Sequence, residues 1–173
     1  ISPATTHGVN GVVASKPAYS NGNAVATGTL VGVVAGRLNI SNSVFVAGGP
    51  KDVLYAVAPG TIQGDYNVYH RPFPESVFAR TTVVGSLFGV RRAEWPYLSS
   101  WQEWSQTDSH SFAADPLLAD WANGDLHPRS QAGRYSPAAD GFVMDDETSP
   151  IIDAAAPATD WSLEPLPNGS RAN

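Results

Sequence analysis

The sequence predicts an all-β protein with an ordered core, built from short strands and many turns. Glycine and proline number 16 and 14 among 173 residues, which is enough for frequent turns but below the share of low-complexity sequence. Apolar residues make up 42% and charged residues 15%, a balance that supports a buried core. Between residues 9 and 69, β-prone runs alternate with glycine, asparagine and proline, which favours strands over a helical bundle.

The first half of the chain supplies five β-prone runs, expected as strands of about four to seven residues joined by tight turns. They are VNGVVA, NAVATGTLVGVVAG, LNISNSVFVAGG, DVLYAVAP and TIQGDYNVYH. The segment that begins at Ile40 can be laid over the one that begins at Ile62 with an offset of about 22 to 24 residues, the length of one coil of a parallel β-helix. Two copies leave two folds open, a solenoid and an antiparallel sandwich or jelly roll, because both use such short strands.

After residue 70 this pattern is interrupted. The two prolines of HRPFPES predict a loop, because proline cannot donate to a strand ladder. Residues 78–90 then form another β-prone stretch. Residues 98–104 carry apolar side chains at i and i+3 spacing, which predicts a short helix with Ser99 or Ser100 as its cap.

The last third of the chain is expected to consist mostly of turns. Prolines recur from Ser111 onward without a fixed period, and each one pushes the preceding residue toward extended backbone. Two short strands are expected in this tail, at LHPRS and at GFVMD. We expect the tail to lie along a surface without a core of its own. Four tryptophans are suited to closing the end of the fold: Trp101, Trp104, Trp121 and Trp161.

Charge and composition exclude several classes of function. The formal charge is -6 and the basic residues form no cluster beyond Arg91 and Arg92, so nucleic acid is not an expected partner. The absence of cysteine excludes disulfides, thiolate catalysis and cysteine zinc sites. No apolar run reaches the roughly 18 residues of a membrane span. Phosphate-loop, Gly-x-Ser-x-Gly and His-Glu-x-x-His motifs do not occur, and no cofactor is expected.

The tail resembles the C-terminal part of right-handed parallel β-helix repeat proteins, which are often secreted bacterial proteins associated with polysaccharides. The resemblance covers about residues 38 to 173 and favours the solenoid over the sandwich. Each motif is weak alone, but their order along the chain is specific. The motifs include Asp108-x-His110-Ser111, Asp115-Pro116-Leu117-Leu118, Asn123-Gly124-Asp125-Leu126-His127 and Thr148-Ser149-Pro150-Ile151-Ile152-Asp153-Ala154.

The resemblance implies right-handed parallel β-helix coils over residues 1–92, followed by a turn-rich C-terminal cap with one short helix over residues 93–173. It implies a location in the extracellular space, in the periplasm or on the cell surface, with contacts to upstream coils or to identical neighbours. Two departures stand out. Ile151 occupies a place where such tails commonly have cysteine. The chain also stops at Asn173, where relatives usually continue into a further strand, so we expect an incomplete chain.

The densest polar cluster near the expected coils runs from residue 65 to residue 75. β-helices that resemble this chain usually bind glycans along a lateral groove. Tyrosine and histidine can stack on sugar rings or hydrogen-bond to them, and Arg71 could hold a uronate carboxylate bidentately. A solvated surface loop is the alternative. The residues predicted to bind polysaccharide are Asp65, Tyr66, His70 and Arg71, with Glu75 nearby.

Two acidic segments invite a functional interpretation but favour turns. Residues 120–125 crowd oxygen ligands around a glycine, yet the acids do not alternate as a hand-type calcium loop requires, so we expect an Asn-Gly turn with hydrogen-bonding aspartates. Residues 145–147 are acidic, but a glycosidase needs two carboxyls about 5 to 9.5 Å apart across the scissile bond. A solvated turn is expected there, and no metal site is predicted in this chain.

Three further residues are expected to hold the cap together. Asp108 and His110 could lie on one side of an extended segment, as acid/base chemistry would require, but hydrogen-bonded cap residues are the favoured interpretation. Arg134 is expected to fix the cap by charge-assisted hydrogen bonds to Asp140 and Asp153.

The sequence therefore predicts a secreted or cell-surface β-helix protein associated with polysaccharide binding or processing. Catalysis is left open. The Gly-His-Gly and Asn-Thr-Asp signatures of β-helix hydrolases are absent, and Arg71-Pro72 is only a fragment of the pectate lyase motif. If the protein is an enzyme, its catalytic coils are expected upstream of Ile1. The alternative is a non-catalytic structural or adhesive solenoid in a larger envelope assembly or filament.

Overall fold

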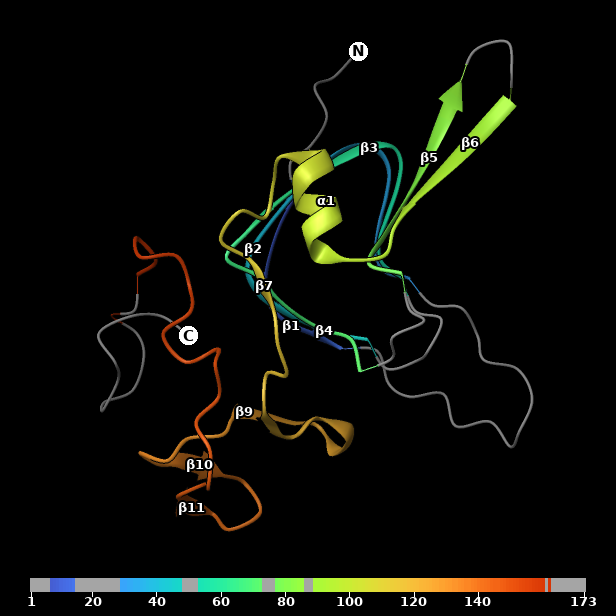
Figure 1. Ribbon diagram of the computed structural model, residues 1–173. Helices are drawn as coiled ribbons and strands as arrows, with labels where there is room; N and C mark the ends of the chain where they lie inside the picture. The colour runs from blue at the N-terminus through green and yellow to red at the C-terminus, as the bar shows by residue number, and fades with distance from the viewer. Residues whose placement is uncertain are drawn as a thin grey trace, which may run out of the picture.

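The structure is a computed structural model that describes residues 7–14, 29–47, 53–72, 77–85, 89–160 and 162. Within these residues the chain is mostly strand with one short α-helix, as the sequence predicts (Figure 1). One sheet has seven strands, and two small sheets are two-stranded. The elements are β1 (His7–Ala14), β2 (Thr29–Val46), β3 (Val53–Asp65), β4 (Val68–His70), β5 (Ala79–Gly85), β6 (Gly89–Trp95), α1 (Leu98–Ser105), β7 (Phe112–Ala113), β8 (Leu118–Asp120), the 3-10 helix η1 (Trp121–Asn123), β9 (Asp125–Pro128), β10 (Arg134–Ser136) and β11 (Gly141–Val143).

The large sheet stacks parallel strands at a constant stagger. β2 pairs with β3 and then with β4, and β3 pairs with β5, always in parallel. Thr29 lies opposite Val53 and Val44 lies opposite Val68, so the stagger is 24 residues (53 minus 29, 68 minus 44). The predicted offset of about 22 to 24 residues is confirmed at its upper limit. We call each level of this stack a layer.

β2 and β3 are longer than the sequence suggests, with 18 and 13 residues. Glycines that were expected in turns lie inside the ladder, where Gly36 pairs with Gly60. Because the ladder stays in register along its whole length, Ile62 lies opposite Leu38 and not opposite Ile40. Two β-prone runs therefore join into one strand, and the turn signals between them do not end it.

The layer after β4 contains an insertion. Val68 pairs with Phe112 of β7, a separation of 44 residues, which is 20 more than the stagger of the earlier layers (112 minus 68, 44 minus 24). The stretch expected over residues 78–90 becomes the antiparallel pair β5 and β6, which projects away from the stack, and α1 follows it (Figure 1). The extra length thus adds β6 and α1 without disturbing the parallel register.

The pairing pattern does not match the antiparallel sandwich that the strand lengths left open. Among the described strands of the large sheet, only β5 and β6 pair in antiparallel fashion. A sandwich or jelly roll is built from antiparallel pairs. The all-β class is therefore confirmed, and its main sheet is of the parallel kind.

Two apolar clusters hold the layers together. In the first, residues one stagger apart lie on one another, since the Phe45 and Tyr69 rings stack with centroids 5.2 Å apart. In the second, Val44 and Val68 pack against Leu118 and Ile151 of the tail. The tail thus covers the layers, as expected for a segment without its own core. The first cluster consists of Ile40, Phe45, Ala47, Ile62, Tyr69, Phe78, Ala79, Leu98 and Trp101.

The predicted helix is present as α1, but its cap differs from the expectation. The N-cap residue is Tyr97, and the Ser100 hydroxyl donates to the Tyr97 carbonyl at 2.8 Å from within the first turn. Leu98 and Trp101 face the core, and Trp104 is more than half exposed. Of the other expected plugs, Trp121 packs against the second cluster, and Trp161 lies outside the described residues. None of the described helical segments has the length and apolar character that crossing a bilayer requires.

Candidate functional site

The residues predicted to bind polysaccharide lie at the two ends of β4. Asp65 ends β3, and Tyr66 follows it with a left-handed backbone (φ 54°). His70 ends β4, and Arg71 comes directly after it. All four side chains are partly exposed. Glu75, which the sequence groups with them, lies outside the described residues.

Asp65 and Tyr66 form a site with His110, a residue that the sequence places in the cap. Val68 pairs with Phe112, so the positions two residues earlier, Tyr66 and His110, lie on one another. Their rings stack with centroids 4.6 Å apart and planes 8° apart. The His110 backbone N–H donates to Asp65 Oδ1 at 2.7 Å, and ring Nδ1 lies 2.8 Å from Asp65 Oδ2. The two layers thus build one polar and aromatic edge.

Hydrogen bonding sets the charge of this site. Burial raises the pKa of Asp65, but hydrogen bonds from the His110 ring, the His110 backbone and the Tyr66 backbone outweigh burial and hold the pKa below its ordinary value of 3.8. The carboxylate is therefore an acceptor at neutral pH. Ser109 Oγ lies 3.3 Å from His110 Nδ1, the same ring nitrogen that faces Asp65. A Ser-His-Asp triad needs serine and aspartate on opposite nitrogens, so this group is not a nucleophilic triad.

His70 and Arg71 have other neighbours. His70 Nε2 lies 3.9 Å from an oxygen of the exposed Asp115 carboxylate, the geometry of a weak surface ion pair. The Arg71 guanidinium carbon lies 5.8 Å from the centre of the Phe78 ring. Burial lowers the pKa of Arg71, and the nearby Tyr97 hydroxyl partly offsets this. The predicted cluster is therefore divided between two places, one before β4 and one after it.

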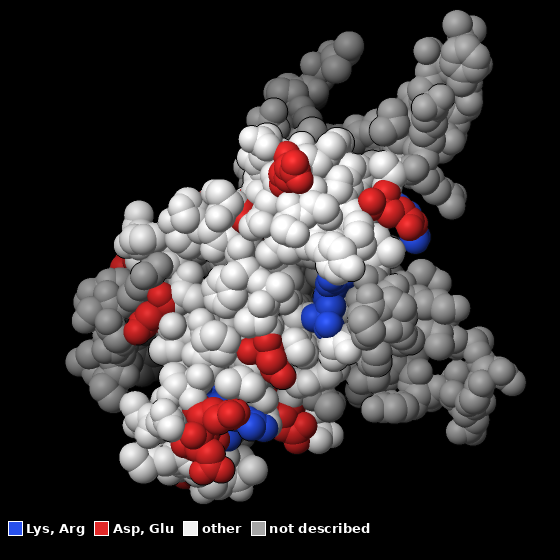
Figure 2. Space-filling model, viewed as in Figure 1, with Lys and Arg blue, Asp and Glu red and all other residues white. Residues whose placement is uncertain are grey.

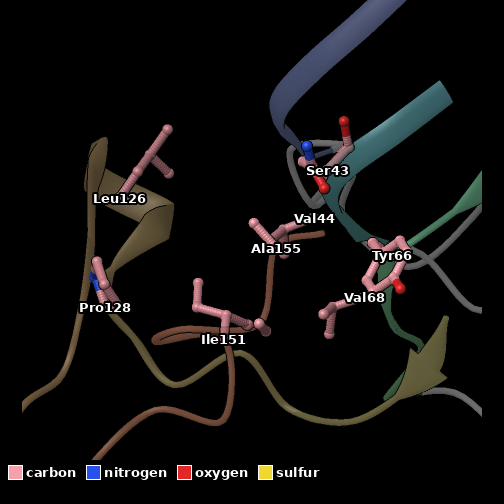
Figure 3. Close-up of a pocket in the computed structure, with 10 residues that line it drawn as sticks. Ser43, Val44, Tyr66, Val68, Leu126, Pro128, Ile151 and Ala155 are labelled. Carbon is pink, nitrogen blue, oxygen red and sulfur yellow. The ribbon is translucent and has the colours of Figure 1, made fainter. Parts of the chain in front are cut away.

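An open apolar hollow lies beside Tyr66, between the layers and the tail (Figure 3). Its volume is about 150 Å³, and a cavity of about that size in another protein accommodates benzene. In Figure 3, side chains of β2 and β4 border one side of the space and tail residues border the other. The lining residues are Asn42, Ser43, Val44, Tyr66, Val68, Leu126, Pro128, Ile151, Ala154 and Ala155.

Asp108 is a fully buried carboxylate at the centre of a hydrogen-bond network. Its Oδ1 accepts from the Tyr69 hydroxyl at 2.8 Å, the Ser111 hydroxyl at 2.7 Å and the Asn67 amide at 3.2 Å. Its Oδ2 accepts from Trp101 Nε1 at 3.1 Å. A buried carboxylate is stable only when such donors replace water. The expectation of a hydrogen-bonded structural residue is confirmed for Asp108.

The loop at residues 120–125 is the expected turn. Asn123 Nδ2 donates to Asp120 Oδ2 at 2.7 Å, and Gly124 takes the left-handed backbone that the turn requires (φ 95°). Across the described part of the chain, no three histidine, aspartate or glutamate side chains gather as a metal site would need.

Arg134 stabilises the tail through partners other than those expected. Its guanidinium donates to the Asp145 carboxylate at 2.8 and 3.2 Å and lies 3.5 Å from Asp125 Oδ2. The prediction of Asp140 and Asp153 is wrong, because the antiparallel pairing of β10 with β11 places Arg134 opposite Val143, two residues before Asp145. The Arg134 hydrogen bonds lower the pKa of Asp145, with a smaller contribution from a backbone N–H. Figure 2 shows the resulting mixture of acidic and basic side chains over β10 and β11.

Comparison with known proteins assigns no family to this chain. No family model, no curated protein and no solved structure matches it. A function for the protein must therefore be argued from the residues and their geometry.

Proposed function

We propose that this chain forms the last coils and the cap of a right-handed parallel β-helix, and that it binds polysaccharide in the extracellular space, in the periplasm or on the cell surface. The constant stagger of 24 residues supports the coils, because each coil of such a solenoid takes a similar number of residues. Leu118 and Ile151 support the cap, because they cover the apolar layer edge at Val44 and Val68.

The observation that carries the binding proposal is the stacked Tyr66 and His110 pair, with the Asp65 carboxylate and an apolar hollow beside it. A sugar ring has apolar C–H faces and a rim of hydroxyl groups. The hollow and the aromatic rings suit the faces, and the ionised carboxylate and the imidazole suit the hydroxyls. One short stretch of the stack therefore offers both kinds of contact.

The proposal is one of binding and does not include hydrolysis. A glycosidase needs one carboxyl that gives a proton and a second that acts as base or nucleophile. Asp65 is held in its ionised form by His110, and Asp108 is buried with both oxygens occupied by donors. These two carboxylates therefore do not form such a pair.

The test replaces Tyr66 by asparagine. Asn42 occupies the equivalent place one stagger earlier with φ 51°, so asparagine suits the left-handed backbone and removes only the ring. Phe142→Ala is the matched control, because Phe142 is an aromatic residue that is 74% exposed on β11. Binding is measured by affinity electrophoresis and calorimetry over neutral and acidic polysaccharides. We expect Tyr66→Asn to weaken binding about tenfold or more, as loss of about 1.4 kcal/mol implies. Equal binding by Tyr66→Asn and the control would refute the site.

A second function, a structural or adhesive solenoid without a glycan site, is favoured by one observation. Among the described residues, the most polar side chains near the layers are committed to internal hydrogen bonds, as the Asp108 network shows. Such a protein would bind no soluble polysaccharide and would associate into larger particles. Light scattering over a range of protein concentrations, together with the same binding panel, separates the two functions.

A further inference from the structure

A second group of exposed aromatic side chains lies where β6 meets α1. Tyr97 is 63% exposed and Trp104 is 55% exposed. Trp95, at the end of β6, is partly buried and packs against the first apolar cluster. We call Trp95, Tyr97 and Trp104 the aromatic surface. Exposed aromatic rings lose apolar contact with water only when a partner covers them, so a group of them indicates a binding surface.

The rings of the aromatic surface are held from below. The Trp104 ring centroid lies 4.3 Å from that of Trp95 and 5.5 Å from that of the buried Trp101. Trp101 in turn donates its indole N–H to Asp108. Trp104 therefore presents an exposed ring on a fixed base. A preorganised ring binds better than a mobile one because less side-chain entropy is lost on binding.

The size of the aromatic surface disfavours a large protein partner. Full burial of a tyrosine or tryptophan removes about 150 to 250 Å² from water. With 63% and 55% of Tyr97 and Trp104 exposed, the two side chains offer on the order of 200 to 300 Å². A stable protein interface needs about 800 Å² from each partner. An extended ligand one or two rings wide fits this area better.

The charges around the aromatic surface disfavour anionic ligands. Glu94 and Glu103 are exposed neighbours of Trp95 and Trp104 in sequence. The Glu94 carboxylate is paired with Arg80 at 2.8 Å, so this cation is already engaged. Figure 2 shows the surface over α1 as mainly uncharged with acidic atoms within it. Carboxylates accept hydrogen bonds and repel other anions, which suits a neutral ligand rich in hydroxyl groups.

We infer that the aromatic surface is a stacking subsite for neutral polysaccharide, an inference that rests on the proposed function. The apolar face of a sugar ring covers the exposed Trp104 ring, and a neighbouring sugar covers Tyr97. Hydroxyl groups at the rim of the sugars donate to the Glu103 carboxylate. The subsite is distinct from the Tyr66 and His110 site, because it is built from the insertion between β5 and β7 rather than from the layers.

The test compares Trp104→Ala, Tyr97→Ala and Trp104→Phe with the matched control Phe142→Ala. The probes are soluble neutral polysaccharides (β-glucan, xylan and mannan) and a polyuronate, with binding measured by calorimetry and by quenching of tryptophan fluorescence. We expect Trp104→Ala to weaken binding of a neutral polysaccharide about tenfold or more. Trp104→Phe should lose less because it keeps a ring, and Phe142→Ala should bind like the wild type. Near-ultraviolet circular dichroism checks folding, and Tyr97→Ala leaves the tryptophan cluster intact if Trp104→Ala does not fold.

The outcomes separate this inference from the proposed function. If Tyr66→Asn loses binding while Trp104→Phe, Tyr97→Ala and every folded Trp104 variant bind like the wild type, the subsite is wrong and the proposed function stands. Binding to the polyuronate alone would also overturn the subsite and leave the function in place. If the wild type binds none of the polysaccharides, both are overturned. Loss of binding in the aromatic-surface variants alone would support the subsite and refute the Tyr66 site.

Discussion

Gly64 lies against the buried Asp108 carboxylate, and replacing it with alanine tests how firmly that carboxylate is held. A Cβ atom built at Gly64 would lie 2.5 Å from Asp108 Oδ1 and 2.8 Å from its Cγ. Atoms do not approach that closely, so one of the two groups must move. Asp108 is not free to move, because its backbone N–H donates to the Gly64 carbonyl at 2.6 Å and its oxygens accept from four side chains.

The cost follows from these contacts. Adding a methyl group to a packed interior costs about 1 to 3 kcal/mol. Loss of one hydrogen bond to the carboxylate adds about 1.5 to 3 kcal/mol. Gly64→Ala should therefore lower the free energy of unfolding by about 3 to 5 kcal/mol. In a domain of this size each kcal/mol lowers Tm by about 2 to 4 °C, so Tm should fall by roughly 10 °C.

Thermal unfolding followed by circular dichroism measures this effect. Gly141→Ala is the control, because its added Cβ would meet no atom closer than 3.7 Å and should leave Tm within about 2 °C of wild type. In Gly64→Ala/Asp108→Ala the clash is absent, so the double variant should be less destabilised than the sum of the single variants. The steric argument fails if Gly64→Ala and Gly141→Ala have the same Tm, or if the two single effects simply add.

Two further predictions concern Asp65 and Asn42. The folded-state pKa of Asp65 is lowered, so its interaction with His110 stabilises the fold above the ordinary carboxyl pKa of about 4, and the contribution is lost as pH falls through the lowered value. Asp65→Asn should thus destabilise at pH 6 and have little effect near pH 2 in urea unfolding; a pH-independent difference contradicts this. Asn42 accepts from the Ala156 N–H and donates to Thr159 Oγ1, both at 2.9 Å. Asn42→Ala should cost about 1 to 2 kcal/mol and speed hydrogen exchange at the Ala156 amide; unchanged exchange would show that the tail is held elsewhere.

The local features of the fold could be predicted from the sequence. Glycine, asparagine and β-branched residues indicate an all-β chain, and the spacing of Leu98, Trp101 and Trp104 indicates α1. The Asn-Gly turn at Gly124 could be predicted because only two or three neighbouring residues decide it. These features depend on residues close together in the chain.

The arrangement of the site depends on residues far apart. His110 meets Tyr66 only because an insertion makes one layer 44 residues long, and no local pattern indicates that length. The partners of Arg134 were mispredicted for a related reason, since the pairing of β10 with β11 decides which acid it meets. A regular step of 24 residues from Tyr66 reaches Val90 and not His110 (66 plus 24), so the repeat alone directs attention to the wrong residue.

The Asp108 network also constrains the order in which this region can fold. Its donors come from β4, from α1 and from the start of β7, and Asp108 lies 39 residues from Tyr69 and 41 from Asn67. A carboxylate that leaves water before all of these donors have arrived is left unsatisfied, at a cost of several kcal/mol. Partly assembled forms with only α1 or only β4 in place are therefore disfavoured. The insertion and the layers should fold and unfold as one cooperative unit, with a rate limited by long-range chain closure.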